Sequence, residues 1–184
     1  MSKSDREFER IGSRTVYDGK IIDVRVERYR YADGEEADRE IVRHEGAAAV
    51  VAVDDDHLWL VRQPREPVGD PDSLELPAGR LDVDGEEPLE AAKRELAEEI
   101  GKRSDDWEHL ATYRSSVGFT DEVVHVFLAS GVADDPDAEP SADENERIEI
   151  VRWPLADLGK LAGEVTDAKT LIGVLLLERR RGGP

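Results

Sequence analysis

The sequence predicts an α/β sandwich in which mixed strands surround one helix and two further helices close the chain. Short apolar or alternating segments typical of strands recur between residues 15 and 153, whereas helices are indicated at only three places. The 184 residues, 39% of them apolar, suffice to bury one core. We therefore expect a single domain over residues 1–184.

Strand signals dominate the first part of the chain. Residues 15–31 alternate apolar and polar side chains around Asp18-Gly19, which predicts a hairpin or two short strands. The strands expected next are residues 40–44, 46–53, 58–63 and 74–79. The second of these is continuously apolar, which indicates burial on both faces, and the third should pair with it across the acidic turn at residues 54–57.

The second part of the chain mixes helices with strands. A helix is expected at about residues 87–100. The strands expected after it are residues 107–115, 123–129 and 147–153, and the closing helices are residues 155–164 and 166–180. Thr166 and Asp167 provide a cap and a first-turn acid for the last helix.

The charge balance restricts the partners. The chain has 44 acidic and 25 basic residues, a net charge of −19, which argues against nucleic-acid and membrane partners. Acids recur in most loops and only six basic residues are lysine, which predicts adaptation to high salt. Cysteine is absent, so oxygen or histidine must hold any metal. No apolar stretch is long enough to cross a bilayer, and we expect a cytoplasmic protein.

Three glutamates mark the helix expected at residues 87–100. Its apolar stripe consists of Leu89, Ala92, Leu96 and Ile100. Glu95, Glu98 and Glu99 fall within about 100° of one another on a different face. Because Glu95 and Glu99 repel each other at i,i+4, a divalent cation would relieve the strain, and oxygen ligands suit Mg²⁺ or Mn²⁺. The alternative is a solvated acidic face in a protein that is acidic throughout.

The spacing around this helix resembles the signature of the Nudix hydrolase family, G-x5-E-x7-R-E-U-x-E-E-x-G-U, in which U is aliphatic. The matching residues are Gly79, Glu86, Arg94, Glu95, Leu96, Glu98, Glu99 and Gly101. Two positions depart from it. Six residues rather than five separate Gly79 from Glu86, and Lys102 occupies the last aliphatic position. The extra residue falls in a loop, where an insertion is tolerated.

The resemblance implies a Nudix-type α/β/α sandwich with a loop-helix-loop catalytic motif that hydrolyses a diphosphate bond. The ligands it implies for Mg²⁺, or for Mn²⁺ as a substitute, are the Ala78 carbonyl and the carboxylates of Glu95, Glu98 and Glu99. Glu98 could also act one step removed from the metal, and Arg94 would orient Glu86 through an ion pair. The metal would neutralise the diphosphate and activate a water.

Outside the signature, residues 15–177 are similar to the ADP-ribose pyrophosphatase branch. Arg39 and Arg65 match branch positions near the substrate, and Phe119 could stack on a base. The alternatives are surface arginines and a core aromatic. Val117 stands where ADP-ribose-specific members usually carry proline, so other ADP-sugars, NADH or a flavin dinucleotide stay open as substrates.

The same branch uses a loop glutamate as general base. Glu144 is the best match, with Glu146 second, and simple solvation of this acidic loop is the alternative. Members are commonly homodimers joined through their N-terminal strands, which points to residues 10–45. The expected partner is a small nucleotide diphosphate, with ADP-ribose cleaved to AMP and ribose 5-phosphate. A Nudix-fold nucleotide sensor is the non-enzymatic alternative, but such modules usually lose signature glutamates.

Overall fold

The computed structural model describes residues 6–138 and 147–182. The chain divides into two compact units, the first formed by residues 1–46 and 114–123 and the second by residues 47–113 and 124–184. Among the helices of the described ranges, none has the length and apolarity to span a membrane.

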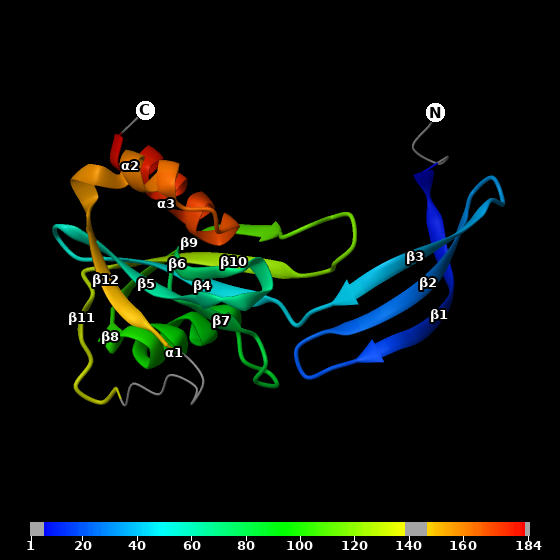
Figure 1. The fold of residues 1–184 in the computed structure, drawn as a ribbon, viewed down its shortest axis with the longest axis horizontal. Coiled ribbons are helices and arrows are strands. Elements are labelled where there is room, and N and C mark those ends of the chain that lie inside the picture. The colour runs from blue at the N-terminus through cyan, green and yellow to red at the C-terminus, as the bar shows by residue number, and fades with distance from the viewer. Residues whose placement is uncertain (1–5, 139–146, 183–184) are drawn as a thin grey trace. The chain divides into compact units, whose positions relative to one another are not determined.

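The first unit contains a three-stranded antiparallel sheet in the order β1-β2-β3 (Figure 1). Its strands are β1 (Phe8–Asp18), β2 (Asp23–Tyr31) and β3 (Glu36–Arg43). The predicted hairpin is confirmed, and Gly19 N–H closes its turn on the Ile22 carbonyl at 3.0 Å. Both β1 and β3 begin earlier than predicted, at Phe8 and Glu36, because residues 8–14 and 36–39 are mostly polar or exposed and apolar patterning did not mark them.

The second unit is built on a mixed sheet. Its strands run in the order β12 (Glu149–Pro154), β5 (His57–Arg65), β4 (Ala47–Val53), β10 (Val123–Ser130) and β9 (Asp106–Arg114), with β6 (Asp70–Glu75) on β5 and β7 (Ala78–Arg80) on β4. β10 runs parallel to β4, whereas β5 and β7 run antiparallel to it. The short strands β8 (Lys102–Arg103) and β11 (Ala133–Asp134) form a separate pair that the sequence did not predict.

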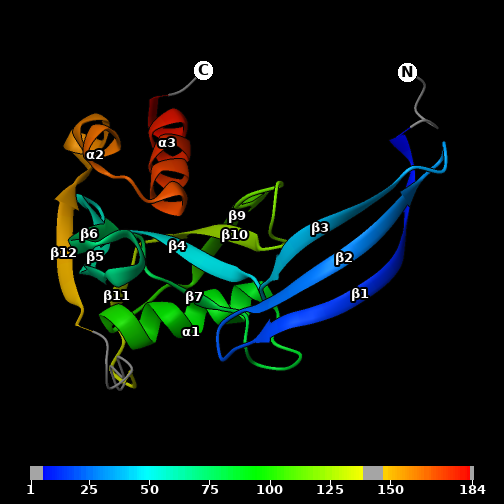
Figure 2. The ribbon, with the colours of Figure 1, turned by 45° about the vertical axis from the view of Figure 1, so that its right-hand side comes forward.

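Helices cover both faces of this sheet. α1 (Pro88–Ile100) packs on one face, and α2 (Leu158–Glu164) and α3 (Ala168–Gly182) pack on the other (Figures 1 and 2). Successive β4 residues serve the two cores in turn: Val50 packs with the α1 side and Val51 with the α2 and α3 side, and both are fully buried. The predicted α/β/α sandwich and the two-faced burial of β4 are confirmed.

Two predicted boundaries were wrong for local reasons. The strand expected at residues 74–79 is two strands, β6 and β7, because Pro77 lies between them and has no N–H for a ladder. Its carbonyl accepts Val50 N–H at 2.9 Å instead. The helix expected at residues 155–164 begins as a 3-10 turn, Leu155–Asp157, before α2.

Helix α3 approaches the sheet closely at Gly173. A Cβ on this residue would lie 2.6 Å from Leu76 Cδ1 and 2.9 Å from Val51 Cγ2. The helix begins at Ala168, and Asp167 caps it by accepting Thr170 N–H at 2.9 Å. The N-terminal turn of α3 is thereby held against the end of β6.

Candidate active site

The signature residues lie where β7 leads through a loop into α1. Pro88 occupies the first turn of the helix, where its missing N–H costs nothing. Gly101 ends the helix in the left-handed conformation, with φ 64°, and its N–H bonds the Ala97 carbonyl at 3.0 Å. Of the predicted stripe, Ala92, Leu96 and Ile100 are buried and Leu89 is partly buried against the same core, so the glutamates lie on a different face of the helix.

Arg94 donates hydrogen bonds to three of the signature carboxylates. Its Nη1 group donates to Glu95 at 2.6 Å and to Glu98 at 2.9 Å. Nε and Nη2 donate to the two oxygens of Glu86 at 3.3 and 3.2 Å. Burial opposes the charge of Arg94, yet the hydrogen bond to Glu86 and the charge of Glu95 outweigh it and raise the arginine pKa. One guanidinium therefore orders three carboxylates on α1 and the loop before it.

Glu95 is the least compensated carboxylate of the site. Its side chain is only 12% exposed, and this burial raises its pKa against the opposing effect of Arg94. The neighbouring charges of Glu98 and Asp82 raise the pKa further. A Cβ on Gly79 would overlap the Glu95 carboxylate. Position 79 requires glycine because the Glu95 side chain passes close to its backbone. The signature spacing alone does not express this constraint.

Glu99 fastens the helix to the preceding strand. Its Oε2 accepts the Ala78 N–H at 3.0 Å. The backbone of residues 78–79 is thereby held beside the carboxylates of Glu95 and Glu99, which lie one helical turn apart.

The donor set suits a divalent cation. Within residues 6–138 and 147–182, no three acidic or histidine side chains converge as metal ligands do. Glu95 and Glu98 are turned to Arg94, and Glu99 to Ala78 N–H. One observation nevertheless fits a cation: added positive charge would stabilise the buried Glu95 carboxyl as an anion, and Gly79 lets this carboxylate lie close to the backbone.

Arg65, predicted to contact the substrate, ends β5 and pairs with Glu75. Its Nε and Nη2 donate to the two Glu75 oxygens at 2.7 and 2.9 Å. Lys169 from α3 lies 2.5 Å from the same carboxylate. Burial would raise the Glu75 pKa, but the hydrogen bond from Arg65 and the charge of Lys169 lower it to about 2. Sequence reasoning missed Glu75; the one signal was an acid inside the apolar run Leu74–Leu76.

Arg39 and Phe119 belong to the first unit, whereas the signature residues belong to the second. Arg39 donates to the Asp38 carbonyl at 2.9 Å and to the Tyr31 hydroxyl at 3.0 Å. The Phe119 side chain is 56% exposed, so the alternative of a core aromatic is wrong. The candidate bases Glu144 and Glu146 lie outside the described residues.

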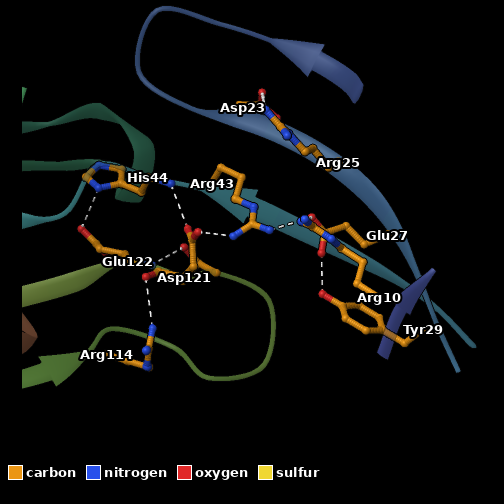
Figure 3. Close-up of polar contacts among 11 residues, drawn as sticks. Arg10, Asp23, Arg25, Glu27, Tyr29, Arg43, His44, Arg114, Asp121 and Glu122 are labelled. Atoms are coloured by element: carbon orange, nitrogen blue, oxygen red, sulfur yellow. Dashed lines mark hydrogen bonds and ion pairs between the residues drawn. The ribbon is translucent and has the colours of Figure 1, made fainter. Parts of the chain in front are cut away.

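A polar network that the sequence did not reveal stabilises the first unit (Figure 3). The buried Glu27 carboxylate accepts hydrogen bonds from Arg10, Arg43 and Tyr29. Arg43 also pairs with Asp121, whose other oxygen accepts the His44 N–H at 3.1 Å. The network ties the segment that carries Phe119 to β3.

Lys102, which departs from the signature, has a packing role. Its ammonium lies 4.0 Å from the centroid of the Trp59 ring and 2.5 Å from Asp134. The side chain is largely buried, so its apolar stem fills the place of the usual aliphatic residue while its charge is paired.

The sandwich and its glutamate-bearing loop-helix-loop define a Nudix-type fold. A "NUDIX domain" family model matches residues 42–172. The chain is 38% identical to the ADP-ribose pyrophosphatase of Bacillus subtilis (strain 168), over 94% of this chain and 93% of the relative. It is also 38% identical to the ADP-ribose pyrophosphatase of Mycobacterium tuberculosis, over 94% of this chain and 84% of that one.

A solved structure titled "Crystal structure of ADP compounds hydrolase" supports the fold, with a TM-score of 0.82 at 24% identity over 96% of this chain and 95% of the other. The chain belongs to the Nudix hydrolase family, which confirms the resemblance that its signature predicted. Nudix hydrolases generally use divalent metal ions.

Proposed function

We propose that the protein hydrolyses the diphosphate linkage of ADP-ribose to AMP and ribose 5-phosphate, with Mg²⁺ as its cofactor and Mn²⁺ as a substitute. The observation that carries the proposal is the arrangement of the signature carboxylates: Arg94 binds Glu86, Glu95 and Glu98, and Glu99 accepts the Ala78 N–H. Two ADP-ribose pyrophosphatases that match across 94% of the chain favour this substrate. Other ADP-sugars and dinucleotides such as NADH are the alternative, because Val117 replaces the usual proline.

The signature residues have different roles in this reaction. We assign the metal to the carboxylates of Glu95, Glu98 and Glu99 and to the Ala78 carbonyl. When bound, Mg²⁺ would neutralise the diphosphate and polarise the attacking water. Arg94 keeps the carboxylates in place, because its guanidinium already bonds Glu95 and Glu98 and pairs with Glu86.

Side chains outside the signature complete the proposal. Arg65 would bind a phosphate, and Arg39 and Phe119 would contact the rest of the nucleotide. Glu144 would take the proton from the water, with Glu146 as the second candidate. Hydrolysis of a diphosphate depends on positioning and charge neutralisation more than on covalent catalysis, so the absence of cysteine is no obstacle.

The proposal extends to assembly and location. We propose a cytoplasmic homodimer in which residues 10–45 take part in the contact, all within one Nudix domain of residues 1–184. A nucleotide sensor with the same fold is the non-enzymatic rival. Retention of every signature glutamate speaks against it, because a protein that only bound nucleotide would not need them.

A substrate panel in ¹⁸O water, with Mg²⁺ and with Mn²⁺, tests the function. We expect ADP-ribose to be turned over fastest, with ¹⁸O in a single phosphate-containing product. The matched controls are Glu99→Gln, in the assigned site, and Glu90→Gln, whose exposed carboxylate pairs with Lys93 on the same helix. Binding of ADP-ribose without turnover of any substrate in the panel would identify a sensor instead.

A further inference from the structure

A buried carboxylate in the second unit joins two cations from distant parts of the chain. Glu75, at the end of β6, is only 2% exposed. Arg65 from β5 and Lys169 from the first turn of α3 both bond it, Arg65 through two hydrogen bonds and Lys169 at 2.5 Å. A desolvated carboxylate is stable only when nearby positive charge compensates its own charge. Because Arg65 and Lys169 bind the same carboxylate, the position of each cation depends on the other.

Lys169 is itself fixed by the start of α3. Its ammonium lies 3.0 Å from Asp167 Oδ1. The other Asp167 oxygen accepts the N–H and the hydroxyl of Thr170, and the fully buried Thr170 hydroxyl accepts Leu76 N–H at 2.9 Å. Glu75 at the end of β6 and Leu76 directly after it are therefore bound to one helical turn, and the Lys169 ammonium has little freedom to move away from Glu75.

Arg65 retains binding capacity that Glu75 does not use. Nε and Nη2 are engaged by Glu75, whereas Nη1 donates no hydrogen bond to the described residues. The Arg65 side chain is 40% exposed. Glu75, to which this guanidinium is bound, lies three residues before Ala78, whose N–H bonds the signature residue Glu99.

We propose that Lys169 is a positioning residue for the substrate diphosphate. By sharing the Glu75 carboxylate, it fixes the Arg65 guanidinium with Nη1 available to a phosphate oxygen, and it offsets the negative charge of Glu75. This inference rests on the proposed function, because it takes Arg65 as a phosphate-binding residue. Together with Asp167, the cluster is neutral; loss of the lysine would leave it at −1 and repel a diphosphate.

Steady-state kinetics with ADP-ribose and Mg²⁺ test the proposal with two variants that change the charge of the cluster in opposite directions, Lys169→Met and Asp167→Asn. We expect Lys169→Met to raise KM about tenfold and to change kcat by less than about threefold. Lys169→Arg should restore most of the loss. Asp167→Asn keeps the helix cap but leaves the cluster at +1, so its KM should stay equal or fall. Lys160→Met, which removes an exposed lysine on α2, is the matched control.

A purely structural role would give a different pattern. An unchanged KM in Lys169→Met, or equal increases in KM for Lys169→Met and Asp167→Asn, would overturn the proposal. If Lys169→Met does not fold, Lys169→Arg and Asp167→Asn decide. KM should stay near the wild-type value in Lys169→Arg and stay equal or fall in Asp167→Asn, and a clear rise in KM in either variant would overturn the proposal.

Binding of inorganic pyrophosphate, measured by calorimetry in Mg²⁺-free buffer, separates this inference from the proposed function. A wild type that hydrolyses no diphosphate would refute the function. Weaker pyrophosphate binding by Lys169→Met than by wild type would still support the positioning role. Equal binding, or no binding by either protein, would refute it.

Discussion

Replacement of Gly79 by alanine tests the geometry of the site with little risk to the fold. The new Cβ would occupy the space of the Glu95 carboxylate. Because the obstructing atoms are the end of a flexible side chain, the carboxylate can rotate away at small cost, and we expect the free energy of unfolding to fall by less than about 1 kcal/mol. The proposed metal ligand would then be misplaced by about 1 Å, which typically costs about 100-fold in rate.

The assay compares kcat/KM on ADP-ribose across a Mg²⁺ titration with urea unfolding of the same samples. Gly79→Ala should lose about 100-fold in kcat/KM and need more Mg²⁺ for half-maximal rate. The control is Gly163→Ala in α2, where a Cβ meets nothing within 4 Å and helix propensity predicts a gain of about 0.5–1 kcal/mol at unchanged activity. A Gly79→Ala enzyme with wild-type kcat/KM at low Mg²⁺ would refute the assignment of Glu95 to the metal.

Three further predictions concern the charged groups. Glu99→Gln should reduce turnover by about three orders of magnitude or more and Glu90→Gln should not; wild-type turnover by Glu99→Gln would remove that residue from the site. The lowered pKa of Glu75, about 2, means that its carboxylate stabilises the fold above its unfolded pKa near 4.5. That contribution, about 3 kcal/mol at neutral pH, should vanish as the pH falls toward 2. Urea melts of wild type and Glu75→Gln between pH 7 and pH 3 should therefore converge, and a constant difference would contradict this. Finally, with a net charge of −19, the melting temperature should rise from low to molar KCl; a flat or falling trend would contradict salt adaptation.

The fold was largely predictable because its core elements follow simple patterns. The run Ala47–Val53 is apolar at every position, which is the pattern expected of a strand that is covered on both faces. In the structure, its residues pack into cores on both faces of the sheet. The edges were less predictable. Strand β6 begins with Asp70, Pro71 and Asp72, and its pairing with β5 depends on backbone hydrogen bonds that its side chains do not reveal.

The candidate site was predictable only where it follows a fixed spacing. Glu95, Glu98 and Glu99 share a helix, so residue numbers alone place them near one another. The cluster of Arg65, Glu75 and Lys169 could not be found in this way. Lys169 follows Arg65 by 104 positions and contacts Glu75 only after α3 packs on the sheet. In a chain with 44 acids, the position of Glu75 between two leucines is too weak a signal to separate a buried glutamate from a solvated one.

The contrast between Glu75 and Glu95 shows why the site calls for a cation. Both carboxylates are largely buried in the same unit, but Glu75 is bound by two cations, Arg65 and Lys169, and its pKa is lowered to about 2. Glu95 shares the single charge of Arg94 with Glu86 and Glu98, and its pKa is raised. Three carboxylates around one guanidinium carry a charge of −2 when ionised, and one divalent ion balances that charge. If this cluster served only to stabilise the fold, we would expect a second arginine or lysine to balance its negative charge, as Lys169 helps to balance the charge of Glu75.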